Sequence, residues 1–136
     1  MNINALKQYK SVDLRASIES ATPHHLITML LGGAQEALAK AAGAIERKDI
    51  GLRTLQLNKA TDIVMNLKGT LNHEAGGELS ANLDRLYDYM VRCLYEANRD
   101  NDESKVREVR GLLSQIAEGW SQIAVSEHHT TSVPAV

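Results

Sequence analysis

The chain has 136 residues, 43% of them hydrophobic, which fits one globular domain and excludes wholesale disorder. The formal net charge is -2, and acidic and basic residues alternate without a block of one sign, so nothing resembles a nucleic-acid footprint. No apolar run approaches the roughly 20 residues that cross a bilayer, and no secretory signal is evident, so we expect a cytoplasmic protein without membrane contact.

The N-terminal part of the sequence predicts an arm followed by a long helix. Residues 1–20 carry apolar side chains at a loosely helical spacing, which indicates a short helix or a mobile arm. Thr22-Pro23 then marks a helix start, because threonine can cap free backbone N–H groups and proline fits the first helical position. Apolar residues recur at steps of three and four as far as Arg47-Lys48, which predicts an amphipathic helix. Gly32-Gly33 lies inside it, where small residues would let another backbone approach closely.

A second amphipathic helix is predicted from Asp49 to a turn at 72–77, which is rich in Asn and Gly. Its main apolar stripe consists of Leu57, Ala60, Val64, Leu67 and Leu71. Three further apolar residues lie to the side of that stripe: Leu52, Leu55 and Ile63. This helix is therefore apolar over more than one narrow face.

A third helix is predicted over residues 76–98, and it carries two apolar rows. The first row consists of Leu79, Leu83, Leu86, Met90, Cys93, Leu94 and Ala97. That row suffices to dock the helix into a bundle. The second row, formed by Tyr87, Val91 and Tyr95, needs another partner, which is either a neighbouring helix or another protein.

A fourth helix is predicted to begin at a variant capping box formed by Asp100 and Glu103, and its apolar residues continue as far as Ile123. Four amphipathic segments joined by short turns predict an all-α, antiparallel four-helix bundle over residues 21–125. An N-terminal arm or short helix at 1–20 and a disordered tail at 126–136 complete the prediction. The surplus apolar faces indicate partner-binding grooves, although contacts with the N-terminal arm would explain them equally well.

No catalytic, cofactor or metal site is predicted. A di-iron bundle needs Glu-x-x-His, which is absent, and we interpret His24 and His25 as solvent-exposed side chains. The run at 67–69, Leu-Lys-Gly, resembles part of a histidine-phosphotransfer motif, but Met65 stands where the phosphorylated histidine belongs. The single cysteine, Cys93, excludes an internal disulfide, and its place on an apolar face is typical of a core residue. We therefore do not expect an enzyme.

A set of different short motifs occurs in order along the chain. It opens with ATPHHLITML at 21–30, followed by Gly33-Ala34. The later members are Leu57-Asn58-Lys59-Ala60, Gly76-Gly77-Glu78, Asn82-Leu83, Leu86-Tyr87-Asp88-Tyr89-Met90, Leu94, Ala97-Asn98, Glu108-Val109, Leu112-Leu113 and Trp120. Together they resemble the signature of the flagellin export chaperones, the FliS family, and cover about residues 5–123. Gly32 departs from the family pattern, which often has an acidic residue there.

The resemblance implies a cytoplasmic chaperone without a cofactor. Such a protein binds the disordered C-terminal region of flagellin, prevents its polymerisation before export and helps deliver it to the flagellar type III export apparatus. By family analogy alone, the export-gate protein and a co-chaperone or regulator are further partners. An amphipathic flagellin segment would fold as helices along hydrophobic grooves of the bundle.

The residues that we expect to bind flagellin are Tyr9, Leu55, Asn58, Lys59, Ile63, Asn82, Leu86, Tyr87 and Tyr89. Tyr9 matches an N-terminal tyrosine of the family. Asn58 and Lys59 would hydrogen-bond the incoming backbone or its carboxylates, and Leu55 and Ile63 would form an apolar wall. Asn82, Leu86 and the two later tyrosines offer a similar mixture on the next helix, because tyrosine supplies apolar area together with a hydroxyl.

Two other functions fit the same sequence. A self-associating helical-bundle protein with no client would use the extra stripes as a homodimer interface, so the chain is predicted to be a monomer or a homodimer. A degenerate phosphotransfer domain would retain a phosphoryl label on His73.

The chaperone hypothesis predicts that Ile63→Asp or Tyr87→Ala weakens binding to flagellin while helicity stays near the wild-type value. Circular dichroism and a binding titration measure the two quantities. Unchanged affinity in both variants would mean that the groove lies elsewhere.

Overall fold

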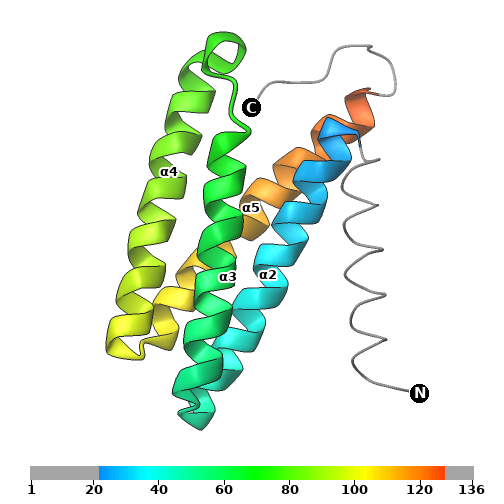
Figure 1. The fold of residues 1–136 in the computed structure, drawn as a ribbon. Helices are drawn as coiled ribbons and strands as arrows, with labels where there is room; N and C mark the ends of the chain where they lie inside the picture. Colours follow the sequence, from blue (N-terminus) through cyan, green and yellow to red (C-terminus); the bar gives the residue numbers. More distant parts are fainter. Residues whose placement is uncertain (1–21, 128–136) are drawn as a thin grey trace, which may run out of the picture.

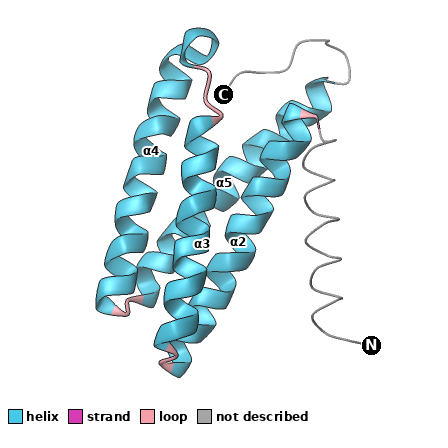
Figure 2. Ribbon diagram, in the orientation of Figure 1, coloured by secondary structure: helices cyan, strands magenta, loops and turns pink. Residues whose placement is uncertain are grey.

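The computed structural model describes residues 22–127, which form four helices (Figure 1). They are α2 (Pro23–Arg47), α3 (Ile50–Gly69), α4 (His73–Asp100) and α5 (Glu103–Glu127). Short loops join them, and this part of the chain contains no strand (Figure 2). The predicted all-α helical bundle is confirmed. The predicted N-terminal arm and most of the predicted tail lie outside the described residues.

Successive helices run antiparallel, so the two ends of the described chain meet at the same end of the bundle (Figure 1). α2 packs against α3 and α5, and α4 packs against the same two helices. The four helices therefore enclose one core, and α2 and α4 lie at opposite corners. None of these four helices is apolar enough over a sufficient length to span a membrane.

Side-chain caps begin α2, α3 and α4. The Thr22 hydroxyl accepts a hydrogen bond from the His25 amide at 3.1 Å, and Pro23 follows at the first helical position, as the sequence predicts. Asp49 and Asn72 cap α3 and α4 through their side-chain oxygens. These caps satisfy backbone donors that would otherwise lack partners.

The structure corrects two predicted helix starts. Asp102, not Asp100, accepts the Ser104 amide at the start of α5, because Asp100 is still the last residue of α4. The predicted turn at 72–77 contains the first turn of α4, which begins at His73. This turn ends at a kink, where Gly77 has φ 54° and ψ -127°. Only glycine adopts that conformation without strain, which explains a glycine there.

The core consists of small and aliphatic side chains, as expected for a chain without phenylalanine. The buried residues of α2 are Leu31, Ala34, Ala37, Leu38, Ala41, Ala44 and Ile45. Those of α4 are Ser80, Tyr87, Met90, Cys93, Leu94 and Ala97. Cys93 and Trp120 are both core residues, with 2% and 6% of their surface exposed.

A polar cluster joins the start of α3 to the end of α4. The Asn98 side-chain oxygen accepts hydrogen bonds from Arg53 Nε at 2.9 Å and from the Thr54 hydroxyl at 3.1 Å. Arg53 also donates to the side-chain oxygen of Asn101, which has the left-handed conformation, with φ 53°. Asn98 thus holds two helix ends together, which gives this residue of the Ala97-Asn98 motif a structural role.

Asn98→Ala should lower the free energy of unfolding by about 1–3 kcal/mol, because it leaves partly buried donors without an acceptor. Urea denaturation measures the loss. Asn66→Ala on α3 is the matched control, since Asn66 is exposed, and it should change stability by less than about 0.5 kcal/mol. Equal effects in the two variants would contradict a structural role for Asn98.

Candidate functional site

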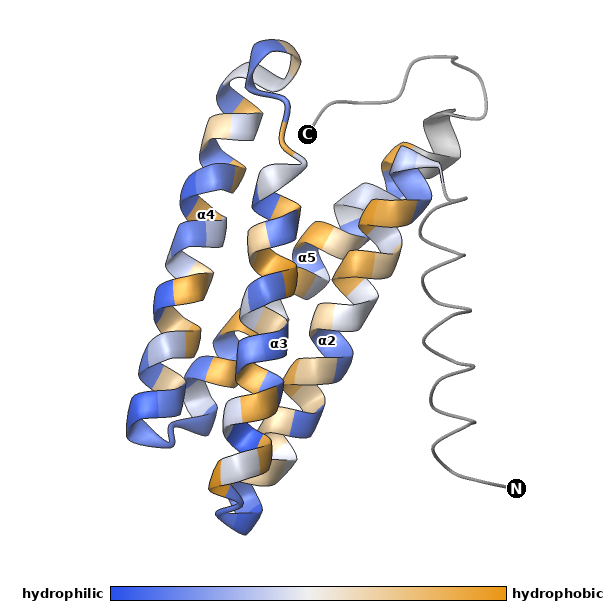
Figure 3. Cartoon of the chain, viewed as in Figure 1, coloured by the Kyte–Doolittle hydropathy of each residue, from blue (hydrophilic) through white to orange (hydrophobic). Residues whose placement is uncertain are grey.

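A hollow of about 410 Å³ lies between α2 and α3. Its lining residues are Leu26, Met29, Leu30, Gly33 and Glu36 of α2 with Lys59 and Ile63 of α3. We call it the α2/α3 hollow. A Cβ atom on Gly33 would lie 3.4 Å from Ile63 Cδ1, which is ordinary van der Waals contact, so the two residues are neighbours across the hollow. Figure 3 shows hydrophobic residues along the N-terminal half of α2 and on α3 beside it.

Two charged residues lie at the rim of the α2/α3 hollow. Glu36 pairs with Lys40 at 3.2 Å, one turn further along α2. Lys59 is exposed, and it forms no ion pair with the described residues. The hollow therefore combines an apolar floor with a cation that is available to a carboxylate of a bound molecule.

The apolar wall continues along α3 beyond the hollow. Leu55 lies one turn before Lys59, and Ile63 lies one turn after it, so the three residues share one side of the helix. Leu55 is 62% exposed, which is unusual for leucine in a bundle. Asn58 is exposed beside this row. The four residues predicted on α3 thus lie together at the surface.

The predicted residues of α4 do not join this group, because α4 packs against α3 and α5 rather than α2. Asn82 is exposed and accepts a hydrogen bond from Arg85. Leu86 is half-buried against the core. The hydroxyl of Tyr89 donates to Glu108 of α5, and this bond raises the pKa of Tyr89 above its ordinary value. Tyr9 lies outside the described residues.

Tyr87 is a core residue, so of the two partners predicted for its row, a neighbouring helix of the same chain is the one that Tyr87 meets. Only 3% of its surface is exposed, whereas Val91 is half-buried and Tyr95 is 69% exposed. The side chains of this row are therefore buried at its first residue and exposed at its last. Tyr87→Ala would remove core volume at a cost of about 3–5 kcal/mol, so it is not a clean test of binding.

Five residues of α2 line the hollow but were not predicted: Leu26, Met29, Leu30, Gly33 and Glu36. The signal in the sequence was the spacing of Leu26, Met29 and Gly33 at i, i+3 and i+7. That spacing places them on one face, beside the face that begins with Ile27. The prediction considered a single apolar stripe on α2 and missed this second one.

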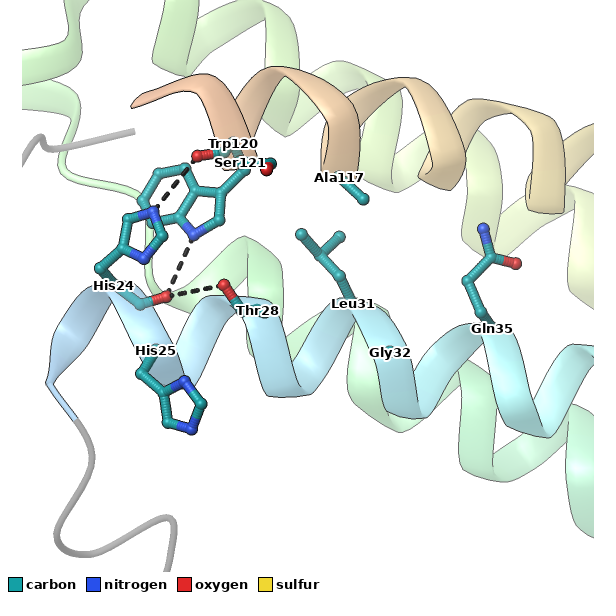
Figure 4. A pocket seen from close by; sticks show the side chains of 9 residues that line it. All are labelled: His24, His25, Thr28, Leu31, Gly32, Gln35, Ala117, Trp120 and Ser121. Carbon is teal, nitrogen blue, oxygen red and sulfur yellow. Dashed lines mark hydrogen bonds between the residues drawn. The ribbon is translucent and has the colours of Figure 1, made fainter. Parts of the chain in front are cut away.

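A second hollow, of about 490 Å³, lies between α2 and α5, and we call it the α2/α5 hollow (Figure 4). The imidazole of His24 stacks on the indole of Trp120 there, with ring centroids 4.6 Å apart. His24 is half-buried, so the prediction that it is solvent-exposed is wrong, whereas His25 is exposed. Sequence spacing alone gave no sign of a pair 96 positions apart.

Ser80, His73 and Asp84 are the residue types of a hydrolase triad, and they lie close together. Ser80 Oγ is 3.1 Å from His73 Nδ1, and His73 Nε2 is 3.9 Å from an Asp84 oxygen. Ser80 has no exposed surface, so a substrate cannot reach its hydroxyl. The cluster instead ties the first turn of α4 across the kink at Gly77. Among residues 22–127, no group of three potential ligands could hold a metal ion.

Comparison with known proteins gives a consistent result. The family model described as "Flagellar protein FliS" matches residues 5–127. The chain is 44% identical over 122 residues to the flagellar secretion chaperone FliSB of Pseudomonas aeruginosa. This alignment covers 90% of this chain and 97% of that protein. The chain is 45% identical to the flagellar secretion chaperone FliS of Salmonella typhimurium, over 89% of this chain and 90% of that one. For the Bacillus subtilis protein of the same name, the identity is 39% over 82% of each chain.

Burial of Tyr87 predicts a loss of stability in alkali. Desolvation raises the pKa of Tyr87 to about 12 in the folded chain, against about 10 when unfolded. The unfolded chain therefore releases this proton first, and stability falls as pH rises from about 10 to 12, by roughly 2–3 kcal/mol. Urea denaturation at pH 9 and pH 11.5 measures the fall, which Tyr87→Phe should reduce. An identical pH dependence in Tyr87→Phe would show that other groups cause the loss.

Proposed function

Because the chain belongs to the FliS family of flagellar secretion chaperones, we propose that it binds the C-terminal region of flagellin in the cytoplasm. Binding would keep flagellin from polymerising and would support its delivery to the flagellar type III export apparatus. Membership of a chaperone family also confirms the prediction that the chain is not an enzyme.

The observation that carries the proposal is the α2/α3 hollow with its exposed apolar extension. Helix-in-groove recognition places the apolar face of an amphipathic helix against a hydrophobic surface. Leu26, Met29, Leu30 and Ile63 provide that surface, and Lys59 can pair with an acidic residue of the client. The client would bury the same apolar face that it needs for assembly with other flagellin molecules.

The energetics require a client that extends beyond the hollow. Ordering a disordered segment costs about 2–5 kcal/mol, and association costs on the order of 4–15 kcal/mol. At roughly 25 cal/mol per Å², several hundred Å² of apolar surface must be buried to exceed these costs. One anchored aromatic side chain supplies only about 150–250 Å². We therefore place further client contacts along Leu55 of α3.

Other partners are part of the same proposal. The family resemblance points to the export-gate protein and to a co-chaperone or regulator, which would bind surfaces that the client leaves free. The alternative function, self-association without a client, would use the α2/α3 hollow as a homodimer interface. Light scattering over a range of concentrations distinguishes the two, because a chain that stays monomeric has no such interface.

Calorimetric titration tests the proposal directly. The purified chain is titrated with the C-terminal segment of flagellin and, separately, with flagellin lacking that segment. We expect binding to the segment alone, with a negative change in heat capacity because apolar surface is buried. Absence of binding to either piece would overturn the proposed function.

The residues of the α2/α3 hollow predict a second result. Ile63→Asp should weaken binding of the flagellin segment by about tenfold or more, since a charge would face the apolar side of the client. Met65→Asp is the matched control, because Met65 is an exposed apolar residue of α3 that does not line the hollow. Calorimetry measures both affinities. Equal losses in the two variants would show that the hollow is not the binding site.

A further inference from the structure

The first turns of α2, residues 23–30, are less buried than the rest of the helix. None of these residues is fully buried, whereas α2 from Leu31 to Ile45 contributes seven buried residues to the core. This segment also separates the two hollows. Leu26, Met29 and Leu30 line the α2/α3 hollow, while His24, His25 and Thr28 line the α2/α5 hollow.

One pair of residues ties this segment to α5 (Figure 4). The rings of His24 and Trp120 stack with an angle of 10° between their planes. Trp120 Nε1 donates to the His24 carbonyl at 3.0 Å, and His24 Nε2 donates to the Trp120 carbonyl at 3.2 Å. The two hydrogen bonds are reciprocal, so together with the stack they fix the position of the first turn of α2 against α5.

Gly32 and Gly33 follow this segment, and the packing does not require glycine at either position. A Cβ atom on Gly32 would have no neighbour within 4 Å, and one on Gly33 would make ordinary contact with Ile63. Glycine in a helix interior lowers helix stability relative to alanine. Two adjacent glycines without a packing reason mark the most deformable point of α2, where the less buried segment meets the more buried one.

We propose that residues 23–30 form a lever that pivots at Gly32-Gly33, and that His24 and Trp120 are positioning residues that set the width of the α2/α3 hollow. This inference rests on the proposed function, because the width matters only to a client that enters the hollow. An outward tilt of this lever breaks the contact between His24 and Trp120. It moves Leu26, Met29 and Leu30 away from Ile63, and it uncovers the indole on α5. A client that prefers the wider form shifts the chain towards it.

The free chain provides the first test, because Trp120 is its only tryptophan and reports on the lever by fluorescence. Acrylamide quenches an indole in proportion to its accessibility, and Trp120 is 6% exposed. His24→Ala breaks the pair and should raise the quenching constant by about twofold or more, as the lever opens. Adding Gly32→Ala to this variant should reverse most of the rise, because the helix stiffens. Adding Gly111→Ala, at an open position of α5, should not.

The second test adds a tryptophan-free C-terminal segment of flagellin, with binding followed by calorimetry. At saturation, the segment should raise the quenching of Trp120 in the wild-type chain. Gly32→Ala should weaken its affinity by roughly 2- to 30-fold while raising the midpoint of thermal unfolding. Gly111→Ala should raise that midpoint with unchanged affinity. A purely structural role for Gly32 cannot produce greater stability together with weaker binding.

The outcomes separate this inference from the proposed function. The proposal of a lever is wrong if acrylamide quenches the double variant His24→Ala/Gly32→Ala as strongly as His24→Ala alone. It is also wrong if the segment binds Gly32→Ala as tightly as wild type and leaves Trp120 quenching unchanged at saturation. If the segment does not bind the wild-type chain, the proposed function fails, and the free-chain measurement alone decides whether the lever exists.

Discussion

The close packing of α2 on α3 is the constraint on which the rest of the bundle depends. Four alanines on the buried face of α2, at positions 34, 37, 41 and 44, are at most 1% exposed, and Ala60 of α3 is fully buried. Such short side chains let two helices approach closely, which a core without phenylalanine requires. Towards Pro23, α2 carries larger and more flexible residues, and the two helices diverge (Figure 1). The bundle is therefore tightly packed at one end of α2 and leaves apolar surface uncovered at the other.

This division between a tight end and an open end connects the stability of the bundle with the proposed binding of flagellin. A client-binding protein must expose apolar residues without losing its fold or associating nonspecifically. Here the alanine-rich part of the core and the Asn98 cluster stabilise the bundle at one end, and the hollows lie at the other. Charged residues at the rim, including Glu36 and Lys59, keep the exposed apolar surface of the α2/α3 hollow discontinuous.

Several residues of the motifs that resemble the FliS signature have structural roles. Pro23 begins α2, Gly77 permits the kink in α4, and Asn98 joins two helix ends. Leu26, Met29 and Gly33, in contrast, line a hollow. A motif residue is therefore no evidence of a binding role by itself. The structure is needed to distinguish residues that stabilise the fold from residues that line a hollow.

The sequence by itself determined the helices, because capping and apolar periodicity act within a few residues of the chain. Thr22-Pro23, Asp49 and Asn72 supply local acceptors or a fixed φ, and the 3.6-residue repeat defines the buried faces. Only the tertiary structure decided which of the extra apolar rows remains exposed. Tyr87 is buried and Leu55 is exposed because the crossing of the helices, not the spacing along one helix, fixes the depth of each side chain. The same holds for His24 and Trp120, whose contact exists only because the start of α2 and the end of α5 meet at one end of the bundle.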